Sequence, residues 1–272
     1  MATPIAIPAQ AKQAPAFGLV PVFSLWQREV VRFYRNLSRV VGVLASPLLF
    51  WLVIGSGFGT SFRNGETNQH YLDFFFPGAL IMIVLFTSIF AMMSLIEDRN
   101  EGFLLSVLVA PVHRSVIVLG KVLGGTTLAT LQGLLFLVFA PLLGVHLGPA
   151  EFLLVVLDVF LMAFSLTALG FAIAWPMDST SGFHAVVNLF LIPLWLLSGS
   201  LFPLSGASLW IRMLMRANPL TYGTEALRAL LFPGSESGVS VATDLAILAL
   251  FTAVMFLLAF VMANRRTRKP AA

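Results

Sequence analysis

Ionisable side chains are rare in this chain, and the densest group of them lies between residues 97 and 121. The group begins with the mixed-charge segment at 97–102, continues as an uncharged, mainly apolar run at 103–110, and regains basic residues at Arg114 and Lys121. About 20 apolar residues are needed to cross a bilayer, so this run is too short to span one. Because an apolar surface exposed to water favours association, the run predicts a docking site for a partner protein. A helix that lies in the lipid interface without a partner is the alternative interpretation.

The residue types needed for catalysis form no recognisable pattern. The chain has no cysteine, which excludes disulfides and thiolate metal sites, and its four histidines show no metal-ligand spacing. The glycine-rich run at 55–60 is not a phosphate-binding loop, because no lysine follows it and no predicted strand precedes it. The pattern G-x-x-x-x-G-K-[ST] occurs nowhere in the chain. We therefore expect no catalytic residue, metal or cofactor in this polypeptide.

The composition predicts an integral membrane protein. Of 272 residues, 58% are hydrophobic and 10% are charged, whereas soluble domains carry about 25% charged residues. Six uncharged stretches could each cross a hydrocarbon core of roughly 30 Å. They lie at residues 40–62, 74–96, 122–150, 159–177, 179–211 and 245–264. They do not alternate as barrel strands would, so the sequence predicts an all-α membrane protein with six transmembrane helices.

Lysine and arginine are unevenly distributed between the predicted loops. With six crossings and an inside N-terminus, twelve of them fall on the cytoplasmic side and four on the outer side. This bias predicts that both termini are cytoplasmic. The net charge of +4 is then an orientation signal, and no basic face of a soluble domain indicates nucleic-acid binding. Residues 1–20 lack the features of a signal peptide, so we expect a flexible cytoplasmic tail there.

An amphipathic helix is predicted directly before the first crossing. Its basic residues at helical spacing are Arg28, Arg32, Arg35 and Arg39. An apolar stripe that includes Trp26 and Phe33 follows the same spacing on the opposite face. Such a helix lies in the membrane interface, with its apolar face in lipid and its arginines toward lipid phosphates or a soluble partner. A simple juxtamembrane anchor and a helix that contacts a partner are equally acceptable interpretations.

Three polar residues within the predicted crossings are candidates for a transport path: Gln132, Asp158 and Asn188. An intramembrane carboxylate is costly and is by default a functional candidate. Asp158 is expected about 10 Å inside the outer surface, at 1.5 Å per helical residue, and neighbouring crossings offer no lysine or arginine to pair with it. Contact with water or a structural hydrogen bond is therefore favoured over substrate binding. Gln132 and Asn188 are expected to form interhelical hydrogen bonds.

The uncharged stretch at 179–211 is too long for one crossing, and Phe202 and Pro203 divide it. We expect the fifth crossing at about 183–201. Beyond it, two amphipathic helices at 209–216 and 224–232 are expected to dip into the outer leaflet while packed on protein, with Asn218 and Pro219 between them.

Two blocks of sequence together resemble a known family. One is the segment 97–121, with Gly102, Leu108, Pro111, Arg114 and Gly120-Lys121; the other joins Leu197-Ser198-Gly199 and Phe202-Pro203 to Asn218-Pro219-Leu220-Thr221-Tyr222-Gly223 and Glu225-Ala226-Leu227-Arg228. From about residue 20 to residue 265, the chain resembles membrane permease subunits of the second exporter type of ATP-binding cassette (ABC) transporters. That family exports drugs, antibiotics, polysaccharides and lipo-oligosaccharides.

The resemblance implies a dimer of permeases, made of two copies of this chain or of this chain and a similar permease. Two separate ATPase subunits, which hold ATP and Mg, would bind beneath it. A coupling helix that enters a groove of the ATPase is implied at Glu97, Arg99, Glu101, Gly102, Phe103, Leu104, Val107, Leu108, Pro111 and Arg114. An elbow helix at 25–38 would include Trp26, Arg28, Arg32, Phe33 and Arg35. A re-entrant outer gate would include Phe202, Pro203, Asn218, Pro219, Tyr222, Glu225 and Arg228. Phe103 departs from the family pattern, in which threonine is frequent after the glycine.

Sequence and resemblance together predict the permease subunit of an ATP-driven exporter in the cytoplasmic (inner) membrane of the cell. The expected substrate is an amphiphilic drug or antibiotic, a lipid or a glycan. The transmembrane domain is expected at 21–265 and a basic cytoplasmic tail at 266–272. Two alternatives remain open. A secondary transporter driven by an ion gradient would favour paired midplane charges or repeated halves, and a passive membrane scaffold would need neither.

Overall fold

The computed structural model describes residues 18–35, 37–57, 71–110, 112–234 and 239–265. The described residues form helices and no strand, which confirms the predicted all-α fold. The expected tails lie outside them except for residues 18–20. The helices are α1 (Leu19–Tyr34), α2 (Leu37–Gly57), α3 (Tyr71–Ala91), α4 (Met93–Asn100), α5 (Phe103–Val109), α6 (Arg114–Leu137), η1 (Ala140–Leu143), α7 (Pro149–Ala174), α8 (Thr180–Leu196), η2 (Leu204–Gly206), α9 (Leu209–Ala217), α10 (Pro219–Leu231) and α11 (Val241–Asn264).

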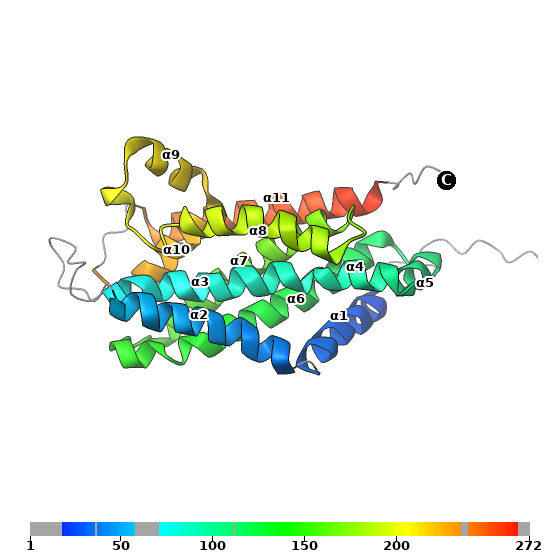
Figure 1. The fold of residues 1–272 in the computed structure, drawn as a ribbon, viewed down its shortest axis with the longest axis horizontal. Helices are drawn as coiled ribbons and strands as arrows, with labels where there is room; N and C mark the ends of the chain where they lie inside the picture. Colours follow the sequence, from blue (N-terminus) through cyan, green and yellow to red (C-terminus); the bar gives the residue numbers. More distant parts are fainter. Residues whose placement is uncertain (1–17, 36, 58–70, 111, 235–238, 266–272) are drawn as a thin grey trace, which may run out of the picture.

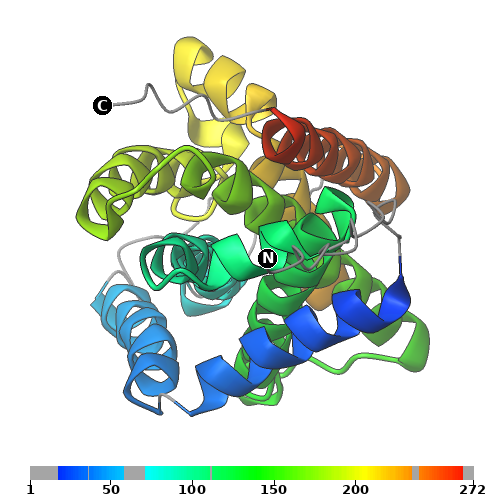
Figure 2. The same ribbon diagram turned by 90° about the vertical axis from the view of Figure 1, so that its right-hand side faces the viewer.

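The long helices run side by side along one axis of the molecule (Figure 1). The short helix α5 lies at one end of this bundle and α9 at the opposite end, and we call these the α5 end and the α9 end. Helix α1 does not join the bundle lengthwise but lies across its α5 end (Figure 2). The α4–α5 segment and α1 are therefore neighbours at the same end.

Polar caps fix where several helices begin. The side chains of Ser179 and Ser240 accept hydrogen bonds from backbone N–H groups in the first turns of α8 and α11. Asn218 does the same for α10, with Pro219 in the first helical position, where its missing N–H has no consequence. Asn218 therefore lies between α9 and α10, as expected, and Pro219 is already the first residue of α10. For this reason the second amphipathic helix begins at residue 219 and not at the expected 224.

Helix α3 forms the centre of the bundle and packs against α2, α6, α7, α8 and α10. Most of its side chains are buried, including the whole aromatic group of Phe74, Phe75 and Phe76. Through a turn at Met92, α3 continues into α4 and carries the chain to the α5 end. In contrast, only 22% of the apolar stretch of α11 is buried, against 78% for α6. Helix α11 therefore presents most of its surface outward.

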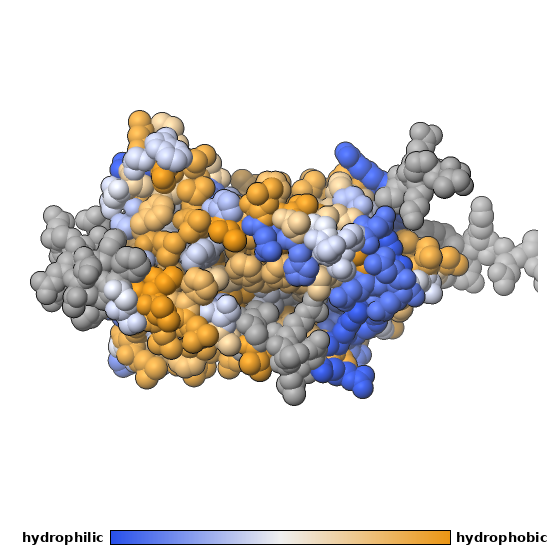
Figure 3. Space-filling model, viewed as in Figure 1, coloured by the Kyte–Doolittle hydropathy of each residue, from blue (hydrophilic) through white to orange (hydrophobic). Residues whose placement is uncertain are grey.

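Four described helical segments are long and apolar enough to cross a membrane: Tyr71–Asn100, Arg114–Leu137, Pro149–Ala174 and Val241–Asn264. Two shorter apolar helices are Ala45–Gly57 and Thr180–Leu196. Apolar side chains cover most of the visible length of the bundle, and hydrophilic residues gather at the α5 end (Figure 3). These features are those of a multi-pass membrane protein, and the count of six crossings stays a prediction.

Candidate functional site

A sharp turn at Gly102 places α5 at the tip of the molecule. Helix α4 ends at Asn100, and Gly102 then adopts φ +80°, a left-handed conformation that side-chain-bearing residues rarely adopt. The seven residues of α5 follow, and the chain returns to the bundle as α6. The apolar run at 103–110 therefore folds mainly as a short helix of its own, whereas the coupling helix implied by the resemblance begins at Glu97, which lies in α4.

Helix α5 has one face turned inward and another turned outward. Leu104 is only 4% exposed, whereas Leu105 is 62%, Leu108 38% and Val109 84% exposed. We call Leu105, Leu108 and Val109 the α5 apolar face. Of the five apolar residues implied for the coupling helix, Leu108 alone belongs to it. Phe103 and Val107 are half-buried, Leu104 packs into the protein, and Pro111 lies outside the described residues.

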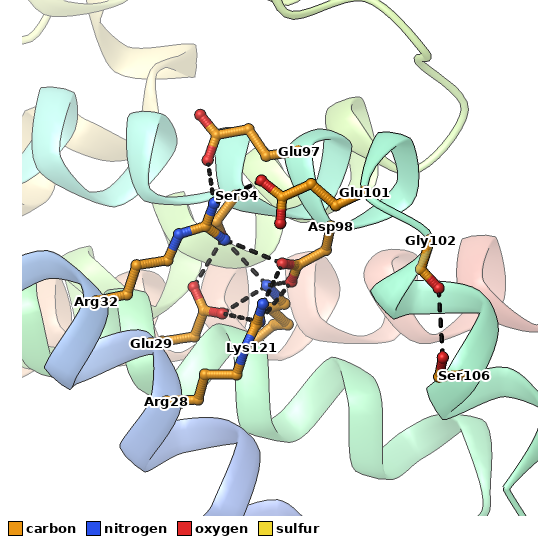
Figure 4. A network of polar contacts seen from close by, with 10 residues as sticks. All are labelled: Arg28, Glu29, Arg32, Ser94, Glu97, Asp98, Glu101, Gly102, Ser106 and Lys121. Atoms are coloured by element: carbon orange, nitrogen blue, oxygen red, sulfur yellow. Dashed lines mark hydrogen bonds and ion pairs between the residues drawn. The ribbon is translucent and has the colours of Figure 1, made fainter.

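Behind α5 lies a buried group of charges that we call the charge cluster: Arg28, Glu29, Arg32, Ser94, Glu97, Asp98 and Lys121 (Figure 4). At its centre, Lys121 is 1% exposed and donates to Glu29 Oε1 at 2.6 Å and to Asp98 Oδ2. Arg28 binds both Asp98 oxygens, at 2.6 and 2.9 Å. Bidentate pairing of this kind is the strong form of the arginine–carboxylate contact. It raises the pKa of Arg28 above its ordinary value, against an opposing effect of burial.

The rim of the charge cluster is more exposed than its centre. Arg32 contacts Glu97 at 2.9 Å and Glu101 at 3.7 Å, and its other terminal nitrogen donates to Asp98. Ser94 donates to the second oxygen of Glu29 at 2.7 Å. Helices α1, α4 and α6 thus share one network in which each buried charge faces an opposite charge, the condition for keeping ions out of water.

Two glycines of α6 allow α1 to come close enough for these pairs. A Cβ atom built on Gly120 would lie 2.6 Å from Leu25 Cβ, and one built on Gly124 would lie 2.6 Å from Glu29 Cβ. Small residues four positions apart form a shallow groove on a helix surface. Helix α1 lies in this groove, which brings Glu29 directly to Lys121.

The orientation expected for the amphipathic helix is wrong. Arg28 and Arg32 face carboxylates of the same chain rather than lipid phosphates or a soluble partner. On the predicted lipid face, Phe33 is buried and Trp26 donates to Thr127 of α6 at 3.0 Å. Hydrophobic periodicity shows that a helix has two faces but not which face meets protein. The exposed residues of α1 include Leu19, Val20, Phe23 and Val31, and Arg35, which follows the helix, is exposed too.

The charge cluster also contacts α5 directly. The guanidinium of Arg28 lies 3.7 Å from the centre of the Phe103 ring, within cation–π distance. Arg28 therefore touches α5 on one side and Asp98 of α4 on the other. Phe103 thereby joins α5 to α1.

Two further arginines tie other parts of the chain to the α5 end. Arg99 donates to the Met177 carbonyl at 2.6 Å and to the Trp175 carbonyl, and it pairs with Asp178 at 3.2 Å. Arg114 donates to the Ala263 carbonyl near the end of α11 at 2.9 Å. The turn between α7 and α8 and the last turn of α11 are thus both fastened to the segment that carries α5.

At the α9 end, the residues proposed as an outer gate hold α10 to the end of α8. Asn218 donates to the Leu194 carbonyl at 2.6 Å, and Arg228 donates to the Gly199 carbonyl at 2.8 Å while lying 4.2 Å from the Phe74 ring centre. Tyr222 donates to the Arg216 carbonyl at 2.8 Å. Pro219 starts α10, and Phe202 and Pro203 are half-buried in the preceding turn. The structure therefore brings most of these residues into one folded unit.

Two charged residues of α10 are perturbed by burial. Burial lowers the pKa of Arg228 to about 10, against the attraction of Glu225, so Arg228 remains a cation at neutral pH. Burial raises the pKa of Glu225, an effect that Arg228 and Arg216 oppose. The α9 end thus contains acidic and basic groups only partly withdrawn from water.

The three path candidates lie in different surroundings. Gln132 accepts a hydrogen bond from Thr87, as expected of an interhelical contact. Asn188 is exposed on α8. Asp158 has no exposed surface, and neither of its oxygens has a hydrogen-bond partner among the described residues. The favoured interpretation of Asp158, contact with water or a structural hydrogen bond, stays a prediction, and no described protein group supplies such a bond.

Sequence reasoning did not assign Glu29, Asp98, Lys121 or Asp244 to a site, nor Leu105 and Val109 of the α5 apolar face. Glu29 is the one acidic residue among residues 18–35, and Lys121 follows the first glycine of the groove, which is the signal that could have paired them. Asp244 directly precedes the last uncharged stretch and was treated as its boundary. It is also fully buried, and no described residue is within hydrogen-bond distance of either of its oxygens.

Comparisons with known proteins match the chain to a family of transporters and to two permeases. Residues 21–232 match the model of the ABC-2 type transporter family. The chain is 29% identical over 256 residues to a putative transport permease, ycf38, of Cyanophora paradoxa, covering 89% of this chain and 88% of that protein. It is 26% identical over 214 residues to the daunorubicin resistance ABC transporter permease protein DrrB1 of Streptomyces coeruleorubidus, covering 76% of this chain and 73% of that one.

Proposed function

The chain belongs to the ABC-2 type transporter family, and from this premise we propose that it is the permease subunit of an ATP-driven exporter. It forms the translocation path and receives movement from a separate ATPase subunit, which binds ATP and Mg. The chain itself is a transport subunit and not an enzyme. Family membership disfavours both alternatives left open by the sequence, the ion-driven transporter and the passive scaffold.

The observation that supports this proposal most directly is the α5 apolar face. Leu105, Leu108 and Val109 are exposed on α5. This helix lies at the end of the bundle where hydrophilic residues gather (Figure 3). Leucine and valine side chains in that position are unfavourable unless another protein covers them. From family membership, the proposed partner is an ATPase subunit with an apolar groove.

The charge cluster gives the proposed docking helix a rigid connection to the bundle. A displacement of α5 reaches α1 through the contact of Arg28 with Phe103 and reaches α6 through Asp98 and Lys121. A partner can shift the conformation only if it contacts the two conformations differently. In the proposed mechanism, closure of two ATPase subunits moves α5 and α1 together and opens a path toward the α9 end.

The remaining features of the proposal follow from charge distribution and family. The excess of lysine and arginine in the loops expected inside supports a cytoplasmic location for the α5 end and for both termini. The proposed location of the protein is the cytoplasmic (inner) membrane. The functional permease is a dimer of this chain or a pair with a similar permease, surrounded by lipid. The substrate is an amphiphilic drug or antibiotic, a lipid or a glycan, and the name of the Streptomyces relative favours the first.

Substitution of the α5 apolar face tests the coupling. Leu105→Asp and Val109→Asp place charges on exposed positions, so the chain should fold and insert normally while losing co-purification with the ATPase subunit and ATP-dependent transport. Gln27→Asp, at an exposed position of α1, is the matched control and should retain both. If the two α5 variants still bind the ATPase and transport with normal rates, α5 is not the docking element.

A further inference from the structure

Two carboxyl groups lie in the membrane-spanning part of the bundle without a visible counterion. Asp158 of α7 and Asp244 of α11 both have 0% exposed surface. All four of their oxygens lack a hydrogen-bond partner among the described residues. Asp158 lies between Val155 and Val159, which are also fully buried, so its surroundings along the helix are apolar.

A charged carboxylate in such a place is physically unfavourable. Transfer of an unpaired ion from water to an apolar interior is so costly that the group instead binds a counterion or becomes neutral. An ionised carboxylate becomes neutral when it takes up one proton. Asp158 therefore needs either a bound cation or a proton.

The two carboxyl groups belong to two helices, α7 and α11, that pack against each other, and they lie at successive depths along them. Thr252 of α11 donates to the Leu161 carbonyl of α7 at 3.2 Å, which fixes the register of the two helices. Asp244 lies eight residues before Thr252, and Asp158 lies three residues before Leu161. At 1.5 Å per residue, Asp244 is therefore about 8 Å closer to the α9 end, where both helices begin.

No described cation is placed to neutralise the pair. Among helices that pack against α7 and α11, α10 brings Glu225 and Arg228, and Arg228 already binds the Gly199 carbonyl and the Phe74 ring. Helix α3 contributes another carboxylate, Asp73, in its first turn. The charged residues of α4 and α6 lie at the α5 end: Glu97, Asp98, Arg99, Arg114 and Lys121.

We propose that Asp158 and Asp244 form a proton-binding site, in which Asp158 is held as a neutral carboxylic acid. The uptake forms one O–H bond between a proton from water and a carboxylate oxygen, with no other bond changed. Asp244 lies in the first turn of α11, where the helix dipole favours a negative charge, and it is the member of the pair nearer the surface. It is therefore the group through which protons reach Asp158.

A proton fits this site better than a larger cation. A group without exposed surface leaves no room for an amine-bearing substrate unless α7, α10 and α11 separate, whereas a proton needs no space. The described residues contain no cluster of three or more acidic or histidine side chains that could hold a metal ion. Two carboxyl groups alone supply too few ligands for the cations that prefer oxygen.

Infrared spectroscopy of the purified full chain in lipid nanodiscs tests the proposal without any transport assay. A protonated carboxyl group absorbs at a higher frequency than an ionised one, and its band shifts in heavy water. We expect a band of this kind at neutral pH in the unmodified protein, its loss in Asp158→Asn, and its retention in Glu151→Gln, which removes an exposed carboxyl group from the same helix. Asp244→Asn should slow deuterium exchange of the band.

Two results would overturn the proposal. One is the absence of the band from the unmodified protein at neutral pH. This includes a band that emerges only after sodium and divalent ions are removed, because a metal cation would then be what Asp158 binds. The other is an unchanged band in Asp158→Asn. The first result needs no variant, so it stands even if a substitution disturbs folding.

Discussion

Buried ionisable groups are paired at one end of the bundle and have no described partner toward the other. At the α5 end, Glu29, Asp98 and Lys121 are at most 6% exposed, and each faces an opposite charge within hydrogen-bond distance. Toward the α9 end, Asp158 and Asp244 are fully buried and face no described partner. Burial is the same in both regions and the partners differ. Partners, rather than burial, therefore decide which groups stay charged.

This difference matches the tasks that we propose for the two regions. A paired charge cluster resists separation, because pulling α1 from α6 would leave ions uncompensated in an apolar place. Such a network suits a segment that must transmit movement as one body. A neutral acid needs no opposite charge beside it, so α7, α10 and α11 can shift relative to one another at little electrostatic cost.

The largest expected effect comes from removing the central cation of the charge cluster. Lys121→Met removes the only fully buried cation of the cluster from Glu29 and Asp98, although Arg28 still binds Asp98. Loss of one member of a buried pair typically costs about 3–5 kcal/mol. Asp158→Asn removes a group that is already neutral and should change the free energy of unfolding much less. Denaturant unfolding of both variants in the same detergent measures the contrast.

A double variant sharpens this prediction. Glu29→Gln combined with Lys121→Met removes both ends of one pair, so part of the stability lost in Lys121→Met should return. If Lys121→Met and Asp158→Asn lowered the free energy of unfolding equally, the contrast between the two regions would be contradicted. Asp158 would then depend on a charged partner as much as the charge cluster does.

A smaller effect is expected from filling the groove that seats α1. Gly124→Leu places a side chain where Glu29 Cβ would be 2.6 Å away, and overpacking of this kind costs about 1–3 kcal/mol. It should also weaken the pairing of Glu29 with Lys121 and lower ATP-dependent transport. Gly57→Leu is the control, since nothing lies within 4 Å of that position. Equal unfolding curves for Gly124→Leu and the unmodified chain would show that α1 does not need this close approach.

Much of this architecture is readable from the sequence. The apolar run at 103–110 is bounded by a glycine and a proline, and it forms a separate helix because it is too short to cross a membrane and cannot extend past Gly102. The all-α membrane fold follows from composition alone. The capping pair Asn218-Pro219 was also visible, although its position inside a predicted linker concealed its role as the start of α10.

The charge cluster could not be predicted in the same way. Arg28 and Asp98 are 70 residues apart, and their pairing depends on how α1 lies across the bundle. Periodicity gives the angle of a side chain around its helix but not the neighbour that this helix meets. Asp158 and Asp244 illustrate the same limit, since each looks like an isolated acid until α7 and α11 are placed side by side.

The smallest expected effect concerns Glu225, which is intermediate between the two regions because it is half-buried and Arg228 and Arg216 partly compensate its charge. Burial raises the pKa of folded Glu225 above the ordinary value of 4.5. The folded state then binds the proton more tightly than the unfolded state. This contribution to stability is fully present below the ordinary pKa and is lost as the pH rises through the raised pKa.

Glu225→Gln cannot ionise, so it should match the unmodified chain at acidic pH and become slightly more stable than it toward neutral pH. Thermal unfolding over that pH range measures the difference between the two curves. Tyr222→Phe, which removes the hydrogen bond to the Arg216 carbonyl but no acid, should instead lower stability by the same amount at every pH, about 1 kcal/mol. A Glu225→Gln curve that stays parallel to that of the unmodified chain would mean that Arg228 and Arg216 compensate the charge completely. Glu225 would then behave like the paired carboxylates of the charge cluster rather than like Asp158.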